Sequence, residues 1–170
     1  RPDNDPRPGR APRRRDRRPG LPIGPHALDD PAAAAPTDFD RALLGVLGLM
    51  GLRSGEARSL LVGDLAASQL TVKNAGSGTD TTKTRASRRT LPVPATVLPW
   101  LTEVVGDRTK SAYLFASPRR AGQPVAKTYP NQALTRAVAR ANDGRPEQIT
   151  RITVHGLRHT FAAITLSEAG

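Results

Sequence analysis

The sequence predicts an α+β domain that is mainly helical and carries one small β-hairpin. Apolar residues recur three and four positions apart in the segments 39–50, 94–105 and 129–141, which is the spacing of amphipathic helices. Apolar and polar residues alternate at 69–73 and 90–93, which is the pattern of half-buried strands. Helices flanking two strands that are adjacent along the chain indicate an α+β fold with helix in excess.

Capping signals delimit the first two helices. Thr37 or Asp38 can cap the first helix, because a side-chain oxygen at that position accepts an N–H of the first turn, and Gly51 ends it. Ser54 can cap a second, short helix that we expect to reach Gly63. Both helices are therefore predicted to lie between residues 37 and 63.

The hairpin and the last helix have their own signals. Residues 74–89 are rich in Gly, Ser, Thr and Asn, and we expect them to form a long flexible loop between the two strands. Pro92 lacks a backbone N–H, so the second strand is predicted at an edge of the sheet. Thr153 can cap a final helix that begins near His155.

The first 36 residues are predicted to be a disordered basic linker, and the folded domain is predicted to span residues 37–170. Residues 1–20 hold eight Arg, three Asp and five Pro with almost no apolar side chains, so burial cannot repay the entropy lost on folding. An arm that contacts DNA is the alternative interpretation of this segment. Because the chain begins with Arg1 rather than Met, we expect it to be an internal piece of a longer protein.

Composition indicates a polyanionic partner. The formal net charge is +11 and the isoelectric point is about 11.4, which favours nucleic acid over a membrane as the partner. The excess persists outside the first 20 residues, where 18 Lys and Arg face 12 Asp and Glu. No apolar run approaches the length of a membrane span. There is no cysteine, which excludes disulfides and thiolate metal sites and fits a reducing interior.

Two basic motifs have the charge needed to bind an anion. Arg53 follows a glycine-initiated turn between two predicted helices, although this feature alone also fits a surface or capping arginine. Lys83, Arg85, Arg88 and Arg89 lie within seven residues, where like charges repel unless an anion lies among them. A DNA phosphate backbone is the natural counterion, and a solvated basic loop is the alternative.

A third motif opens the last predicted helix. His155 and Arg158 are three positions apart and therefore share one helix face. Both lie in the first turn or so, where the helix dipole also favours an anion. His155 and His159 have the spacing of a zinc-binding helix, but the Glu of that motif and a third ligand are missing, so no metal site is predicted.

Together these motifs resemble the tyrosine recombinase, or phage integrase, family over about residues 38–170. The family's first catalytic Arg lies in a GLR-x-x-E context, and GLRSGE gives Arg53 with Glu56 as the accompanying acid. The family's H-x-x-R box matches HGLRHTF and gives His155 and Arg158.

The family's catalytic Lys lies at a β-hairpin that precedes a strand similar to SRRTLPVP. The segment TKTRASRRTLPVP has this form, so the resemblance assigns Lys83, with Lys73 as the alternative. From the crowding of positive charge in the same segment, we expect Arg85, Arg88 and Arg89 to contact the DNA backbone.

The resemblance implies site-specific DNA recombination by strand cleavage and rejoining through a phosphotyrosine intermediate. Arg53 and Arg158 would clamp the non-bridging phosphate oxygens, and His155 would donate to those oxygens or accept the Tyr proton. Lys83 would protonate the leaving 5′ oxygen, and Glu56 would orient a neighbouring Arg. No cofactor is implied. The implied partners are double-stranded DNA and other recombinase protomers in a synaptic complex. The implied location is on DNA in the cytoplasm, for a protein of bacterial or phage origin.

The nucleophile of the family lies downstream of the H-x-x-R box. The tyrosines of this chain are Tyr113 and Tyr129, both upstream of the box, and neither is assigned as the nucleophile. We therefore expect a catalytic domain that is incomplete at its C-terminus and inactive alone. A non-enzymatic DNA-binding protein, or a decayed recombinase remnant, is the alternative interpretation.

Overall fold

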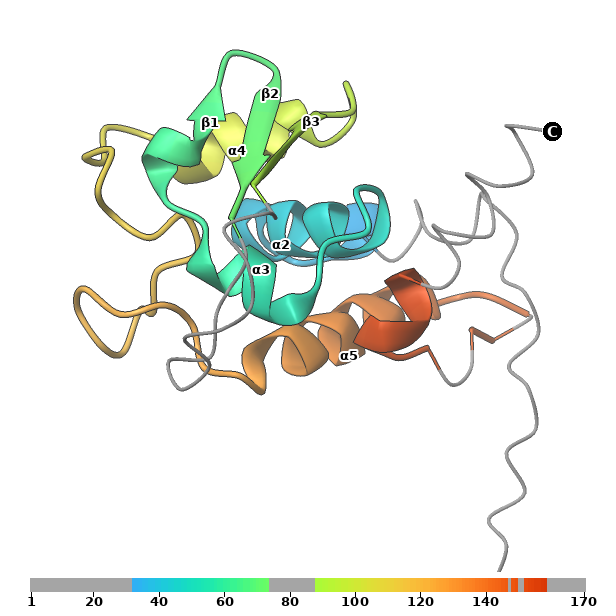
Figure 1. Cartoon of the computed structure of the whole chain (residues 1–170). Helices are drawn as coiled ribbons and strands as arrows, with labels where there is room; N and C mark the ends of the chain where they lie inside the picture. Colours follow the sequence, from blue (N-terminus) through green and yellow to red (C-terminus); the bar gives the residue numbers. More distant parts are fainter. Residues whose placement is uncertain (1–31, 74–87, 147, 150–151, 159–170) are drawn as a thin grey trace, which may run out of the picture.

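The structure is a computed structural model that describes residues 32–73, 88–146, 148–149 and 152–158. Within these residues helices and a small three-stranded sheet follow one another along the chain, and the predicted α+β class is confirmed (Figure 1). No helix of the described part is long and apolar enough to cross a membrane. The elements are α2 (Asp38–Gly48), α3 (Ser54–Ser59), the 3₁₀ turn η1 (Val62–Asp64), β1 (Leu65–Ala66), β2 (Gln69–Val72), β3 (Arg89–Pro92), α4 (Leu98–Val105) and α5 (Tyr129–Ala141).

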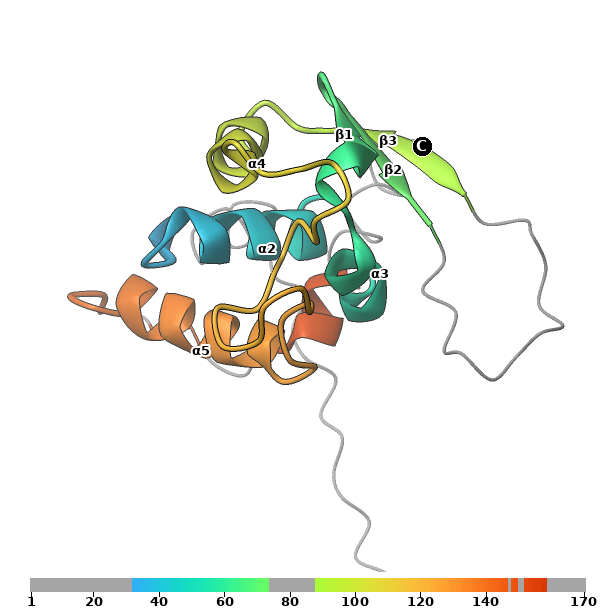
Figure 2. The ribbon, with the colours of Figure 1, turned by 90° about the vertical axis from the view of Figure 1, so that its left-hand side faces the viewer.

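Helix α2 is the centre of the domain. It lies between α4 on one side and α5 on the other, in both views (Figures 1 and 2). The Oγ1 of Thr37 accepts the backbone N–H of Asp40 at 3.1 Å, so the predicted cap is confirmed. A side chain built at Gly45 would lie 3.1 Å from both methyl groups of Val97, which lets α2 and the start of α4 approach closely. The buried side chains of α2 thus form the middle of one continuous core.

The sheet is antiparallel with strand order β1-β2-β3. Strand β3 lies at an edge of the sheet, as predicted, and its Pro92 pairs with Gln69 of β2. Strand β1 was not predicted from the sequence, because its two residues are too few to show an alternation. Its pairing of Leu65 with Leu70 adds a third strand to the expected hairpin.

Both ends of helix α3 differ from the sequence prediction, and α4 begins at Leu98 instead of residue 94. Helix α3 ends at Ser59 instead of continuing to Gly63, because Leu60 has extended backbone angles and Leu61 pairs with Tyr113. The residue that caps α3 is Arg53 rather than Ser54.

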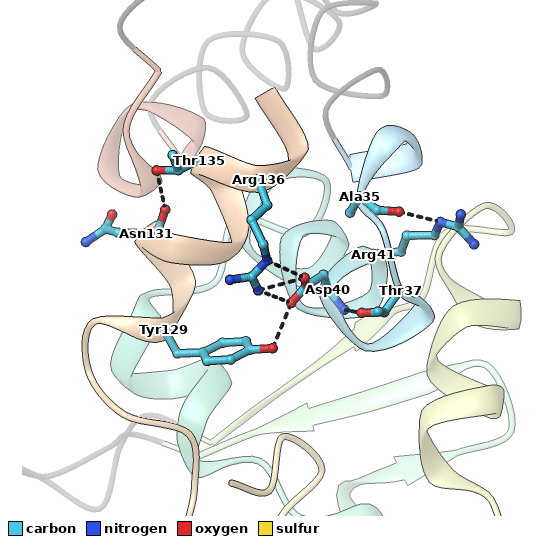
Figure 3. Close-up of polar contacts among 8 residues, drawn as sticks. All are labelled: Ala35, Thr37, Asp40, Arg41, Tyr129, Asn131, Thr135 and Arg136. Atoms are coloured by element: carbon cyan, nitrogen blue, oxygen red, sulfur yellow. Dashed lines mark hydrogen bonds and ion pairs between the residues drawn. The ribbon is translucent and has the colours of Figure 1, made fainter. Parts of the chain in front are cut away.

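The N-terminal boundary also differs. Residues 32–36 were assigned to the linker, but residues 32–34 are helical and the side chains of Ala32 and Ala35 are buried in the core. Arg41 of α2 donates from Nε to the carbonyl oxygen of Ala35 at 3.1 Å, which fixes this segment to the helix (Figure 3). Small alanine side chains permit this close packing. The rest of the expected linker lies outside the described residues.

A buried carboxylate joins α2 to α5. Asp40 is 1% exposed and accepts hydrogen bonds from the Tyr129 hydroxyl at 3.0 Å and from Arg136 Nη2 at 2.8 Å (Figure 3). The Arg136 guanidinium also lies 5.3 Å from the centre of the Tyr129 ring, which is a cation–π contact. Phe39 packs edge-on against Tyr129, with 5.8 Å between the ring centres. This network fixes α5 against the central helix.

Candidate nucleic-acid interface

Arg53 lies at the turn between α2 and α3. Gly51 adopts a left-handed backbone with φ of 65°, which reverses the chain after α2 at a position that favours glycine. Leu52 is buried and anchors the turn in the core, and the Arg53 side chain that follows is 63% exposed. The turn is therefore anchored by a buried leucine and presents an arginine at the surface.

Glu56 binds two arginines at once. Its side chain is only 3% exposed, and its Oε2 accepts the backbone N–H of Arg53 at 2.8 Å while its Oε1 accepts Nη1 of Arg53 at 3.2 Å. Arg89, which lies on β3, donates from Nη1 to Oε1 and from Nη2 to Oε2, each at 3.0 Å. Two cations thus share one carboxylate, and these three residues together carry one positive charge. We call them the Glu56 cluster.

Ionisation of Glu56 depends on its two partners. Burial alone raises the pKa of the Glu56 carboxyl, but hydrogen bonds from Arg89 and Arg53 together with the charge of Arg89 outweigh it, and the net pKa is lowered. The same contact raises the pKa of the Arg89 guanidinium. Glu56 therefore remains a carboxylate at neutral pH. Stability from this contact is present above the unfolded-state pKa of Glu56 and is lost as the pH falls through its lower folded pKa.

The H-x-x-R turn packs near the same end of α2. Residues 154–158 are helical, and Thr153 Oγ1 accepts the N–H of Gly156 at 2.9 Å, so the predicted cap is confirmed. Leu157 is buried, and a side chain built at Gly48 would lie 3.9 Å from it. His155 is exposed and Arg158 is half-buried. The C-terminal end of α2 therefore packs beside the H-x-x-R turn and leads along the chain into the turn that carries Arg53.

Cations at the base of the hairpin bind different carboxylates. Lys73, directly after β2, lies 2.5 Å from Oδ1 of the largely buried Asp64, whereas Arg89 binds Glu56. Arg88, the residue before β3, is exposed. The other two expected cations of the hairpin loop, Lys83 and Arg85, lie outside the described residues.

The two tyrosines have structural surroundings. The Tyr129 hydroxyl donates to Asp40, and burial together with the Asp40 charge raises the pKa of that hydroxyl, which disfavours the phenolate. Tyr113 is half-buried and pairs with Leu61 through the backbone. Neither residue lies in the Glu56 cluster.

Comparisons with known proteins agree with the motifs and the fold. The model of the "Phage integrase family" matches residues 28–170. The chain belongs to the phage integrase family. As an integrase-family domain it spans about half the length of the solved structures that it resembles, covering 51% to 56% of them. No curated protein sequence matches it.

Three solved structures share the fold of this integrase-family domain. The XerA recombinase is 21% identical over 87% of the chain with a TM-score of 0.66. The Tn1549 transposon integrase in complex with circular intermediate DNA is 25% identical over 91% of the chain with a TM-score of 0.67. A variant of that integrase in complex with transposon right end DNA is 24% identical over 91% of the chain with a TM-score of 0.65. The fold is thus that of integrase and recombinase structures.

Sequence reasoning missed the partner of Arg89. We expected Arg89 to contact DNA phosphates with Arg85 and Arg88, but both of its Nη donors are bound to Glu56. The two residues are 33 positions apart, so no local pattern indicated the contact. The interaction of Arg53 with Glu56, in contrast, is local and follows from their spacing.

Proposed function

We propose that this chain forms the phosphate-binding part of a site-specific DNA recombinase, which cleaves and rejoins DNA through a phosphotyrosine intermediate. The observation that carries the proposal is the Glu56 cluster, which holds Arg53 at the surface and retains one positive charge. Family membership and the packing of the H-x-x-R turn near the same end of α2 support it. Solved integrases of this fold are complexes with DNA, which supports duplex DNA as the partner here.

The chemistry assigns a role to each cation. A transition state of phosphoryl transfer carries extra negative charge on the non-bridging oxygens, and the forks of Arg53 and Arg158 can bind these oxygens while remaining charged. His155 donates to the same oxygens or accepts the proton of the attacking Tyr. The bond energy is kept in the phosphotyrosine, so rejoining needs no external energy source.

The nucleophile belongs to a segment downstream of the H-x-x-R box. The hydrogen bond of the Tyr129 hydroxyl to Asp40 and its raised pKa disfavour Tyr129 as the nucleophile. We propose that a natural polypeptide that continues past Gly170 supplies the attacking Tyr, and that other protomers join it on DNA in the cytoplasm. A non-enzymatic DNA-binding protein is the second candidate, favoured by the structural surroundings of both tyrosines in this chain.

Lys83 is the proposed general acid, and the contacts of Lys73 support the choice. Lys73 is held by Asp64, and its ammonium would have to leave that carboxylate before it could protonate a leaving oxygen. In the polypeptide that carries the nucleophile, we expect Lys83→Ala to slow cleavage by about 10²-fold or more. A substrate with a bridging 5′ sulfur should restore the rate, because sulfur leaves without a proton. A defect in Lys73→Ala with none in Lys83→Ala, measured as single-turnover cleavage, would reverse the assignment.

DNA binding by the 170-residue chain tests the proposed partner. We expect weak binding of a short fluorescent duplex whose affinity falls steeply with salt, because each phosphate contact releases counterions. Changing Arg85 and Arg88 together to Gln should lower the slope of log affinity against log salt by about 0.9 for each arginine. Deleting residues 1–20 is the control, since that segment alone carries eight Arg. An unchanged slope in the double variant would show that the hairpin loop does not meet the DNA backbone.

A further inference from the structure

Arg89 differs from the neighbouring Arg88 in how it is held. Arg88, the residue before β3, is exposed. The guanidinium of Arg89, in contrast, donates to both carboxylate oxygens of Glu56, each at 3.0 Å. Such a two-pronged contact with a carboxylate that is 3% exposed is among the stronger ion pairs in proteins. The guanidinium of Arg89, whose side chain is 35% exposed, is therefore bound to the protein, while Arg88 is exposed.

The charge of Arg89 determines what Glu56 does to Arg53. Glu56 contacts Arg53 through the backbone N–H and Nη1, so Nε and Nη2 of that guanidinium lie off the carboxylate. With Arg89 present, the carboxylate is already neutralised, and the Arg53 charge remains to attract an anion. Without Arg89, a buried carboxylate would have Arg53 as the remaining partner in the cluster, and it would compete with a DNA phosphate for the same guanidinium.

We propose that Arg89 is a positioning residue that neutralises Glu56 and thereby leaves the guanidinium of Arg53 available to a DNA phosphate. The proposal rests on the function proposed above for Arg53. It gives Arg89 a role different from the direct phosphate contact that the sequence suggested. Arg88 keeps that contact role and serves as the matched control.

The test is a double-mutant cycle on DNA binding by the 170-residue chain, with a short fluorescent duplex at low salt as the probe. We expect Arg53→Gln and Arg89→Gln each to weaken binding about tenfold, as for loss of one charged hydrogen-bond contact. The variant with both changes should bind no more weakly than Arg53→Gln alone, because both changes remove the same contact. Arg88→Gln should weaken binding independently, so that its effect multiplies with that of Arg53→Gln.

A compensating change separates the charge role from a purely structural one. Removing the carboxylate charge with Glu56→Gln should make Arg89 dispensable, so that Glu56→Gln with Arg89→Gln binds like Glu56→Gln alone. A role limited to holding β3 against α3 would instead be lost in Glu56→Gln itself, because that change breaks the same contact, so Glu56→Gln alone would bind as weakly as Arg89→Gln. This pair also leaves no buried charge unpaired, so it carries the test even if Arg89→Gln alone fails to fold.

The outcomes distinguish the two proposals. If the effects of Arg53→Gln and Arg89→Gln multiply, and each lowers the salt slope by about 0.9, Arg89 contacts DNA itself and the positioning role is overturned. An affinity of Arg89→Gln equal to that of the unaltered chain overturns it as well. If the unaltered chain shows no salt-dependent binding, or Arg53→Gln changes nothing, the proposed function fails instead.

Discussion

Arg53→Ala and Arg158→Ala are each expected to slow DNA cleavage by about 10²–10³-fold in the natural polypeptide that carries this chain and its nucleophile. In the proposed function, each change removes a cation that would bind the non-bridging oxygens more tightly in the transition state than in the ground state. Because Arg53 is held by Glu56 and by a buried turn, its side chain needs little reorganisation during the reaction. The measurement is single-turnover cleavage at saturating DNA.

Arg88→Ala is the control for these variants. Its proposed contact with DNA is the same in the ground and transition states, so we expect weaker binding but a near-normal rate at saturation. Replacing both Arg53 and Arg158 should slow cleavage by a smaller factor than the product of the two single effects, because both residues act on one phosphate. Cleavage by Arg53→Ala at the unaltered rate would contradict the role assigned to it.

Arg136→Ala is expected to destabilise the fold by about 2–3 kcal/mol, which is more than Asp40→Ala should cost. Loss of Arg136 leaves the carboxylate of Asp40 buried with Tyr129 as its remaining side-chain partner, whereas Arg136 left alone can turn to water because it is 43% exposed. This exposure places the expected cost below that of a fully buried pair. The measurement is urea unfolding of the chain at neutral pH.

The neighbouring helix position supplies the control for this prediction. Arg140 is an exposed arginine in the last turn of α5, and Arg140→Ala should change stability by less than about 0.5 kcal/mol. Equal losses of unfolding free energy in Arg136→Ala and Asp40→Ala would contradict this expectation. That result would mean that the loss comes from the broken ion pair and not from a buried carboxylate left without its cation.

Local patterns predicted the long elements well. The apolar spacing of 129–141 gave α5 with the bounds that the structure has, and the Thr37 cap gave the start of α2. Elements that depend on distant partners were less predictable. Helix α3 stops at Ser59 because the residues after it pair with the segment around Tyr113, which propensity cannot anticipate.

In the candidate site too, local contacts were predictable and contacts between distant residues were not. Arg53 and Glu56 are three positions apart, so their contact could be expected from the GLRSGE motif. The binding of Arg89 to Glu56 and of Lys73 to Asp64 depends on how the hairpin packs beside α3 and η1. The spacing of residues along the sequence does not indicate this packing.

One overlooked signal was local. Asp40 interrupts the apolar face of the first helix, three positions before Leu43, and an acid at such a position requires a buried cation or donor. Arg136 and Tyr129 supply it. Helical spacing alone could therefore have predicted a polar network between α2 and another helix.

The most direct test of the account is to look for the covalent intermediate. The natural polypeptide that contains this chain is incubated with a labelled duplex of its recombination site, nicked so that the cleaved end diffuses away, and the adduct is mapped by mass spectrometry. We predict a 3′-phosphotyrosine at a Tyr downstream of residue 170, with a free 5′ hydroxyl, and severely slowed formation in Arg53→Ala. Absence of any adduct, or an adduct on Tyr113 or Tyr129, would contradict the account.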